Sequence, residues 1–231
     1  MPRAIGQVTT SATTRVAITS TSYVEQTSGA QRSLKSSSAS DAAAGTGARK
    51  VRVTYHALSS AGAIAGPFVE TVTLNGTTIV AMVATDLALV EKMEVVDAGS
   101  SGVAAGTISL YDDAAGTGSV FAGIATGDVR TRYAHHYVPS NRACEVTDLE
   151  CIGGDAAAAL VEVAAMPPGG VEQPATGQYG TTATLPRSVS LKDGGLIPGP
   201  ARVQLMVTPA NANAQTTVAS FGYVDRMTSA I

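Results

Sequence analysis

Apolar residues recur at every second position in short segments of this chain, and turn-forming residues separate the segments. In residues 50–57, Val51, Val53 and Tyr55 alternate with polar side chains. Alternate residues of an extended chain lie on the same face, so these three side chains form one apolar face. The pattern predicts a half-buried β-strand over residues 50–57.

Further segments have the same character, are bounded by Gly, Pro, Asn or Asp, and follow one another at intervals of about 12 residues. They are residues 90–97, 107–111, 119–124, 130–138, 144–152, 159–165, 202–208 and 216–224. Short strands at this spacing are typical of a sandwich or a barrel. The sequence therefore predicts an all-β, antiparallel fold.

The Asn75-Gly76 pair lies between two β-branched runs in residues 70–82. This dipeptide readily places two consecutive residues at positive φ, as a type I′ hairpin turn requires. With Asn75 and Gly76 as the loop, Leu74 faces Thr77 across the ladder. We expect an antiparallel hairpin here.

The chain length of 231 residues allows one large all-β domain or two small ones. We expect residues 31–231 to form a single β-sandwich domain with a long polar loop at residues 171–195. Residues 1–30 are rich in Thr and Ser and form either an extended N-terminal arm or a first strand. For residues 15–24, with their scattered β-branched side chains, a strand and a mobile arm both remain open.

The composition narrows the possible functions. Hydrophobic residues make up 45% of the chain, but aromatic residues only 4%, and Trp is absent. A core of small side chains suits a two-layer sandwich better than a deep ligand cavity. Charged residues are 14%, against about 25% in soluble domains, which indicates a surface covered in part by further copies of the chain. The net charge of -3 includes no basic stripe, so nucleic acid is not an expected partner.

Targeting signals and cysteines give little further information about function. The first residues lack the apolar run of a secretory signal, and no segment approaches the roughly 18 apolar residues of a membrane span. We therefore expect synthesis in a cytoplasm and no membrane partner. Cys144 and Cys151 define no disulfide framework. They lie on one predicted strand, seven positions apart, so we expect free thiols on opposite faces.

Candidate metal ligands are few. His135 and His136 are adjacent, and neighbours on a strand point to opposite faces, so they cannot hold one ion together without a bulge. A surface pair or a contact between subunits fits them better. Asp112 and Asp113 suit a calcium-binding loop by their oxygen ligands, but no alternating acidic residues accompany them, which favours an ordinary turn. The sequence predicts no metal site and no cofactor.

Catalytic motifs are also missing from the sequence. No nucleophile elbow, phosphate-binding loop or paired-carboxylate motif occurs. We therefore expect no enzymatic activity and no catalytic residues. A carbohydrate-binding module would share the all-β fold, but such modules bind sugars on exposed aromatic rings. Tyr133 and Tyr137 share one face of a predicted strand, where packing in a core or an interface explains them more simply.

A short phrase recurs between the predicted strands. Ala-Ala-Gly-Thr-Gly occurs at residues 43–47 and 114–118, and Ala-Ala-Gly-Thr at residues 104–107. The flanking residues do not align well. This favours repeated use of one loop chemistry over an internal duplication.

Several longer phrases occur in a fixed order. Residues 36–53 run from Ser-Ser-Ser-Ala-Ser-Asp into a strand, and residues 70–77 read Glu-Thr-Val-Thr-Leu-Asn-Gly-Thr. Residues 94–110 contain Gly-Ser-Ser-Gly and Gly-Thr-Ile-Ser-Leu. In this order the phrases resemble a group of tailed-bacteriophage virion structural proteins. Residues 137–144 resemble a further turn of that group and depart from it at Ser-Asn-Arg, where Ala-Gly-Lys is usual.

The resemblance covers residues 31–231 and implies a β-sandwich of jelly-roll type in a virion component without catalytic residues. We expect a capsid decoration or cement protein that bridges major capsid subunits. A tail, collar or baseplate component is the alternative, and a host-glycan binding module is a more distant one. The expected partners are the major capsid protein and further copies of this chain. Besides residues 171–195, the candidate interface residues are Arg15, Ile18, Tyr23, Tyr133, His135 and Tyr137.

Overall fold

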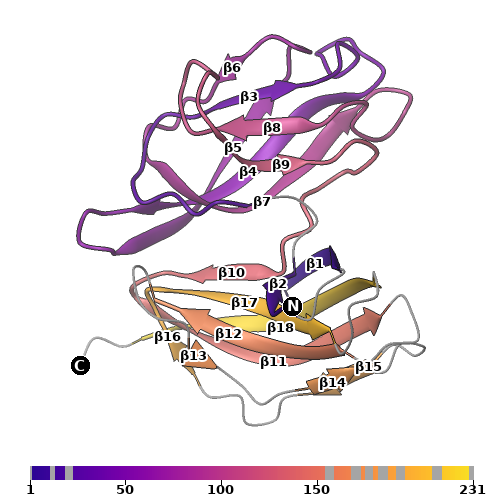
Figure 1. Ribbon diagram of the computed structural model, residues 1–231. Coiled ribbons are helices and arrows are strands. Elements are labelled where there is room, and N and C mark those ends of the chain that lie inside the picture. Colours follow the sequence, from indigo (N-terminus) through magenta and orange to yellow (C-terminus); the bar gives the residue numbers. More distant parts are fainter. Residues whose placement is uncertain are drawn as a thin grey trace. The chain divides into compact units, whose positions relative to one another are not determined.

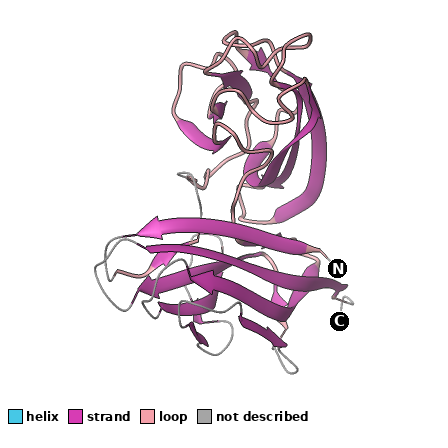
Figure 2. Ribbon diagram, turned by 90° about the vertical axis from the view of Figure 1, so that its right-hand side faces the viewer, coloured by secondary structure: helices cyan, strands magenta, loops and turns pink. Residues whose placement is uncertain are grey.

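The structure, a computed structural model, describes residues 2–10, 14–18, 23–153, 159–167, 173–174, 179–181, 187–190, 196–209 and 215–228. Over these residues the chain consists of strands and loops without a helix (Figure 2). It follows that this part of the chain holds no helix long and apolar enough to cross a membrane. The predicted all-β fold is confirmed.

The chain folds into two compact units. Unit 1 comprises Met1–Ser20, Gly62–Ile64 and Tyr133–Ile231, and unit 2 comprises Thr21–Ala61 and Ala65–Arg132. Unit 2 is therefore inserted within the sequence of unit 1. This differs from the single domain predicted over residues 31–231. The spacing of strands along a chain does not reveal which strands pair, so two small sandwiches give the same pattern as a larger one.

Two sheets build unit 1, with the strand orders β1-β18-β11-β15 and β10-β17-β12-β13 (Figure 1). The strands of the first sheet are β1 (Arg3–Thr10), β11 (Arg142–Gly153), β15 (Arg187–Ser190), β16 (Ile197–Pro198) and β18 (Gln215–Met227). Those of the second are β2 (Val16–Ala17), β10 (His135–Val138), β12 (Ala159–Met166), β13 (Gln173–Pro174), β14 (Tyr179–Thr181) and β17 (Ala201–Pro209). β1 pairs with β18 over its whole length. The N-terminal segment is thus a first strand rather than a free arm.

Unit 2 contains sheets with the strand orders β6-β3-β8-β9 and β5-β4-β7 (Figure 1). The strands of the first are β3 (Ser33–Ser36), β6 (Val80–Ala81), β8 (Ile108–Tyr111) and β9 (Val120–Ile124). Those of the second are β4 (Ala48–Leu58), β5 (Ile64–Thr73) and β7 (Leu87–Ala98). The predicted sandwich class is confirmed, while the jelly-roll type stays a prediction.

Each unit has its own apolar core. The core of unit 1 contains buried side chains from both of its sheets, among them Val146, Leu149, Phe221, Val163, Val203 and Leu205. In unit 2 the fully buried side chains include Leu34, Val51, Leu89, Met93, Leu110 and Phe121. Burial of a Leu or Phe side chain contributes about 1.5–3 kcal/mol, so these thin cores depend on many small contributions.

Most strands lie where the sequence pattern places them, including those at residues 90–97 and 216–224. β10 is shorter than the predicted strand at residues 130–138, because Arg130 instead forms a bridge with Glu94 of β7. Residues 171–195, predicted as a loop, contribute the short strands β13, β14 and β15, which pair with β12 and β11. Other parts of this segment lie outside the described residues.

In β4 the expected alternation holds only over the first half of the strand. Val51 and Val53 are fully buried and the intervening Arg52 is exposed. A register shift follows between Thr54 and Tyr55. Around this shift Thr54, Tyr55 and His56 are all buried, so the strand is covered on both faces there, while Ala57 and Leu58 are half-buried.

The predicted antiparallel hairpin around Asn75 and Gly76 does not form, because β5 and β6 on either side of the turn belong to different sheets and only an isolated bridge joins its two sides. Asn75 pairs with Thr78, whose N–H donates to the Asn75 carbonyl oxygen at 3.0 Å. Gly76 has a φ of 60°, and no described non-glycine residue has a positive φ. A type I′ turn needs two such residues, whereas Gly alone at the first central position fits type II′. The predicted pairing of Leu74 with Thr77 is therefore wrong.

A bulge at Thr147 interrupts β11, where the register with β18 shifts. Beyond it the alternation reverses, because Val146 and Leu149 are both buried although they are three positions apart. The expectation that Cys144 and Cys151 lie on opposite faces assumed unbroken alternation and loses its basis. Cys144 is a buried free thiol, as predicted; the side chain of Cys151 lies outside the described residues.

Candidate functional site

The side chain of Asp41 is fully buried in unit 2 and accepts hydrogen bonds from several loops. Its Oδ1 accepts from the N–H groups of Ala48 at 2.7 Å and Ala105 at 2.9 Å. Its Oδ2 accepts from the Ser36 hydroxyl at 2.6 Å and the Gly106 N–H at 2.9 Å. Burial of a carboxylate is costly unless it is fully hydrogen-bonded, so these contacts make Asp41 a structural junction.

The phrases that resemble phage proteins meet at this junction. The groups that bond the Asp41 carboxylate come from residues 36–53 and 94–110. Residues 70–77 reach the same place through Gly76, whose N–H donates to the Asp41 carbonyl oxygen at 2.7 Å. Three segments that are separate in the sequence therefore build one structural feature. Sequence reasoning missed it, although a single acidic residue in a Ser- and Gly-rich loop was a usable signal.

Each copy of the recurring Ala-Ala-Gly-Thr phrase lies beside a carboxylate. The copies at residues 43–47 and 104–107 both contact Asp41. In the copy at residues 114–118, the Thr donates to Asp113 from its hydroxyl at 2.8 Å and from its N–H at 3.1 Å. The hydroxyl bond is the main cause that lowers the pKa of the Asp113 carboxyl. This supports repeated use of one loop chemistry.

Arg15, Ile18 and Tyr23, predicted for an interface, all contact the protein's own strands. Arg15 Nε donates to Glu162 Oε2 at 2.7 Å, and the Tyr23 hydroxyl accepts from the Val90 N–H at 3.1 Å. Ile18 is 2% exposed and packs within the core of unit 1. Packing within the chain accounts for Ile18, and an interface role for Arg15, Ile18 and Tyr23 stays a prediction.

Tyr133, His135 and Tyr137 form a buried row of rings along β10 and the residues before it, with His135 stacked on Tyr133 and edge-on to Tyr137. Their exposed fractions are 3%, 6% and 0%. The His135 ring centroid lies 5.3 Å from that of Tyr133 and 5.2 Å from that of Tyr137. Rings buried in this way do not offer a flat surface to a sugar, so packing accounts for them. Their role in an interface stays a prediction.

His136 points to different neighbours from His135 and meets residues of the other sheet of unit 1. His136 Nε2 lies 2.9 Å from Asp225 Oδ1 on β18. Cys144 of β11 completes the cluster, with one ligand atom from each of the three residues within 4.8 Å of the others. The Tyr223 ring stacks on the His136 ring with centroids 3.8 Å apart. These ligand types suit a transition metal.

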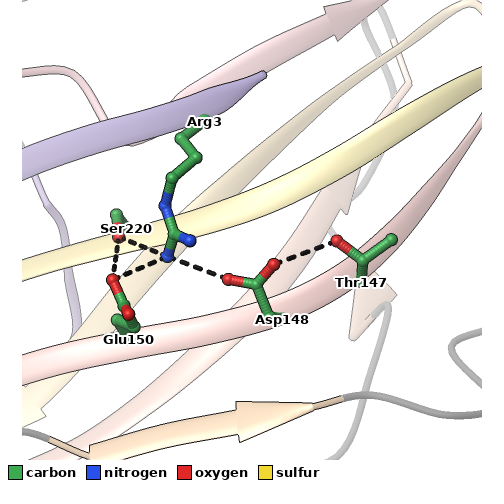
Figure 3. Close-up of polar contacts among 5 residues, drawn as sticks. All are labelled: Arg3, Thr147, Asp148, Glu150 and Ser220. Carbon is green, nitrogen blue, oxygen red and sulfur yellow. Dashed lines mark hydrogen bonds and ion pairs between the residues drawn. The ribbon is translucent and has the colours of Figure 1, made fainter. Parts of the chain in front are cut away.

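Arg3 joins β1 to β11 across β18 (Figure 3). Its Nη2 lies 2.8 Å from both Asp148 Oδ1 and Glu150 Oε2, and 3.0 Å from the Ser220 hydroxyl. The hydroxyl of the bulge residue Thr147 donates to Asp148 Oδ2 at 3.1 Å. The bulge thus directs Asp148 toward Arg3. The contacts tie the N-terminal strand to β11.

Unit 2 exposes apolar side chains along one strand, β5. Phe68 and Val69 are 41% and 60% exposed, and Val83 beside them is 84% exposed. The Glu70 carboxylate of β5 accepts from the N–H groups of Val83 at 2.7 Å and of Ala84 at 2.9 Å. The side chain of Glu70 therefore holds the exposed Val83 next to this strand.

The two edges of the β5-β4-β7 sheet differ. The edge of β7 is closed, because Val95 donates to the Val129 carbonyl oxygen at 2.7 Å and Thr131 donates to that of Met93 at 2.9 Å. Residues 65–73 of β5 have no comparable segment against them among the described backbone contacts. An open strand edge with exposed apolar side chains is a surface on which another chain can add a strand.

Comparisons with known proteins give little further information. No protein-family model matches the chain, and no curated protein matches it. A solved structure of infectious bursal disease virus, Gt strain, matches with a TM-score of 0.28 and 10% identity, over 96% of this chain and 70% of that chain. The Gx strain of the same virus matches with a TM-score of 0.20 and 12% identity, over 95% and 70%. At these TM-scores the likeness is weak and assigns no function.

Proposed function

We propose that the protein is a non-enzymatic structural component of a tailed-bacteriophage virion. In this proposal it is made in the host cytoplasm, assembles with further copies of itself, and decorates the capsid by bridging major capsid subunits. It uses no cofactor and binds neither nucleic acid nor a membrane.

The observation that carries the proposal is the junction at Asp41. The phrases at residues 36–53, 70–77 and 94–110 gave the resemblance to virion proteins, and all of them meet at Asp41, two at its carboxylate and the third at its carbonyl oxygen. The side-chain oxygens of Asp41 are committed to structural hydrogen bonds and are shielded from solvent. Because the residues that carry the resemblance build a structural junction, the resemblance supports a shared fold and a role in assembly rather than a shared active site.

The open edge of β5 is the surface we assign to assembly. Val69 on this strand is 60% exposed, and Val83, which the Glu70 carboxylate holds next to the strand, is 84% exposed. Burial of one Val side chain contributes about 1.5 kcal/mol, and backbone hydrogen bonds to an added strand supply direction and register. We infer that a strand of a neighbouring virion subunit pairs with β5.

The alternatives have less support. A tail, collar or baseplate role uses the same fold and the same edge, and only the location in the virion distinguishes it. A host-glycan module loses its candidate residues, since Tyr133 and Tyr137 are buried.

Immunogold labelling of native virions tests the location. We expect gold particles over the head. A signal confined to the tail would end the decoration proposal in favour of the tail, collar or baseplate alternative. Virions without any label, when the antibody binds the purified chain, would end the virion proposal altogether.

A pair of matched variants tests the β5 edge. Val69→Asp places a charge on the open edge, and Val96→Asp makes the same change on β7, whose edge is closed and where Val96 is 44% exposed. The loss of about 1.5 kcal/mol per buried Val reduces incorporation into virions by about tenfold. We expect this loss for Val69→Asp only. Equal incorporation of the two variants contradicts the assignment of β5.

A further inference from the structure

We propose that His136, Cys144 and Asp225 bind a zinc ion between the two sheets of unit 1. The proposal is independent of the virion role, because it rests only on the contacts within unit 1. The sequence analysis predicted no metal site, since the adjacent His135 and His136 cannot share an ion. The structure instead brings His136 together with residues from two other strands.

The three ligands come from rigid positions. Cys144 and Asp225 are directly opposite each other in the register between β11 and β18, so their side chains leave the same face of the first sheet. His136 lies on β10 of the second sheet. An ion held by all three residues would therefore link the two sheets.

The distances between the ligand atoms come close to those of tetrahedral zinc and require small side-chain shifts. Zinc binds imidazole nitrogen, thiolate sulfur and carboxylate oxygen at about 2.0–2.3 Å, so its ligand atoms lie roughly 3.3–3.7 Å from one another. In the cluster these atoms lie within 4.8 Å of one another. The His136 Nε2 to Asp225 Oδ1 distance of 2.9 Å has to open slightly. Side-chain adjustments of this size need no movement of the strands.

The donor set selects against other common ions. Calcium and magnesium bind six or more oxygen atoms at their sites, and this cluster offers one carboxylate. A thiolate with an imidazole favours zinc among the abundant divalent ions. The thiolate and the carboxylate together carry two negative charges, which a zinc ion neutralises in a site where Cys144 is fully buried.

Tyr223 holds the imidazole in position. Its ring stacks on His136 with an interplanar angle of 21°, and it lies two residues before Asp225 on β18. Restriction of the ring lowers the entropy lost when the metal binds. The side chain of Asp225 is 16% exposed and marks where solvent can approach, so a water molecule is the expected fourth ligand.

Cobalt titration of the full chain tests the site. The protein is purified in reducing buffer, treated with a chelator and titrated with Co²⁺ and then Zn²⁺. We expect one Co²⁺ per chain, with a thiolate-to-cobalt charge-transfer band in the near ultraviolet and visible bands typical of tetrahedral coordination. Zn²⁺ should displace Co²⁺ and abolish these bands.

Two pairs of variants locate the ligands. Cys144→Ser should abolish the charge-transfer band and weaken Zn²⁺ binding at least about tenfold, in line with the loss of a metal ligand, whereas Cys151→Ser should do neither. His136→Gln should weaken binding in the same way, and its neighbour control His135→Gln should not. Asp225→Asn serves where a core variant fails to fold, since Asp225 is partly exposed.

The outcomes are decisive. Absence of a charge-transfer band in the wild-type chain overturns the proposal, as does Zn²⁺ binding that survives in Cys144→Ser or Asp225→Asn. Binding lost in Cys151→Ser but kept in Cys144→Ser also overturns it. A second readout is the urea midpoint, which Zn²⁺ should raise in the wild-type chain and leave unchanged in Cys144→Ser.

Discussion

Replacement of Asp41 tests whether the junction in unit 2 holds its loops together. Asp41→Ala removes every acceptor of the carboxylate and leaves the N–H groups of Ala48, Ala105 and Gly106 without their partner. The Ser36 hydroxyl also loses its acceptor, but it can rotate toward another group. The variant therefore leaves the buried donors of Ala48 and Gly106 and the part-buried donor of Ala105 unsatisfied.

The size of the effect follows from these contacts. A buried, unsatisfied donor costs about 1–3 kcal/mol. The summed cost of the three donors is an upper value, because the loops can relax and water can enter to bond the free N–H groups. We therefore expect Asp41→Ala to lower the free energy of unfolding by about 3–5 kcal/mol. Asp41→Asn keeps one oxygen for Ala48 and Ala105. Its NH₂ group can donate to the Ser36 hydroxyl but not accept from Gly106, so this variant should cost about 1–3 kcal/mol.

Urea unfolding of the full chain measures both variants. Because the two units can unfold separately, hydrogen exchange at Ala48, Ala105 and Gly106 identifies the transition that belongs to unit 2. Asp97→Ala is the control, since the Asp97 carboxylate is exposed and lies 3.9 Å from Lys50, and it should change stability by less than about 0.5 kcal/mol. Equal midpoints for Asp41→Ala and the control, or equal costs for the Ala and Asn variants, would refute the reasoning.

Three further substitutions test other contacts by urea unfolding. Burial alone raises the pKa of Glu94, but hydrogen bonds from Arg52 and a neighbouring lysine lower it overall. The ion pair of Arg52 with Glu94 therefore stabilises the fold above the unfolded-state pKa of about 4.3. This stabilisation is lost as the pH falls through the lowered pKa of the folded state. Arg52→Gln should therefore lower the midpoint at pH 7 more than at about pH 3, and a pH-independent loss contradicts this. Ile18→Ala should cost about 2–5 kcal/mol, and a loss below this range would place Ile18 outside the core. Gly76→Ala should lower the free energy of unfolding more than Gly102→Ala. Both glycines have a positive φ, but only at Gly76 would a new Cβ lie 3.1 Å from backbone atoms of a neighbouring loop. Equal losses for the two variants would contradict this contact.

The strands of this protein could be predicted from the sequence because alternation reports which side chains face a core. The strand at residues 216–224 was placed in this way. Pairing could not be predicted, because it depends on contacts between distant segments. The turn at Asn75 shows this, since the Gly76 N–H bonds to the Asp41 carbonyl oxygen and the strands on either side of the turn pair in different sheets. The bulge at Thr147 has no local sequence signal either.

The candidate metal site was beyond sequence reasoning for the same reason. His136, Cys144 and Asp225 lie on three strands from two sheets, and no spacing rule relates them. The local argument about His135 and His136 was sound, because their rings have different neighbours. The adjacency of His135 and His136 excludes one ion bound by both residues. It does not exclude an ion that one of them binds together with residues distant in the sequence. Knowledge of the pairing between β11 and β18 would have been needed.

The division of the chain also bears on the order of folding. β1 pairs with β18, so the first sheet of unit 1 cannot close until the C-terminal strand exists. All strands of unit 2 lie between them in the sequence. Chains fold from the N-terminus during synthesis, and long-range closure costs more loop entropy. We therefore expect unit 2 to fold first and the pairing of β1 to form last.

Arg3 offers a kinetic test of this order, since its guanidinium bonds Asp148 and Glu150 across β18. Contacts that form after the transition state affect the unfolding rate and leave the folding rate nearly unchanged. Arg3→Ala should therefore accelerate unfolding of unit 1 in stopped-flow urea jumps while refolding keeps its rate. The same acceleration should be absent for Arg52→Gln, whose ion pair lies in unit 2. If Arg3→Ala instead slows refolding, β1 docks before the sheet closes and the proposed order is reversed.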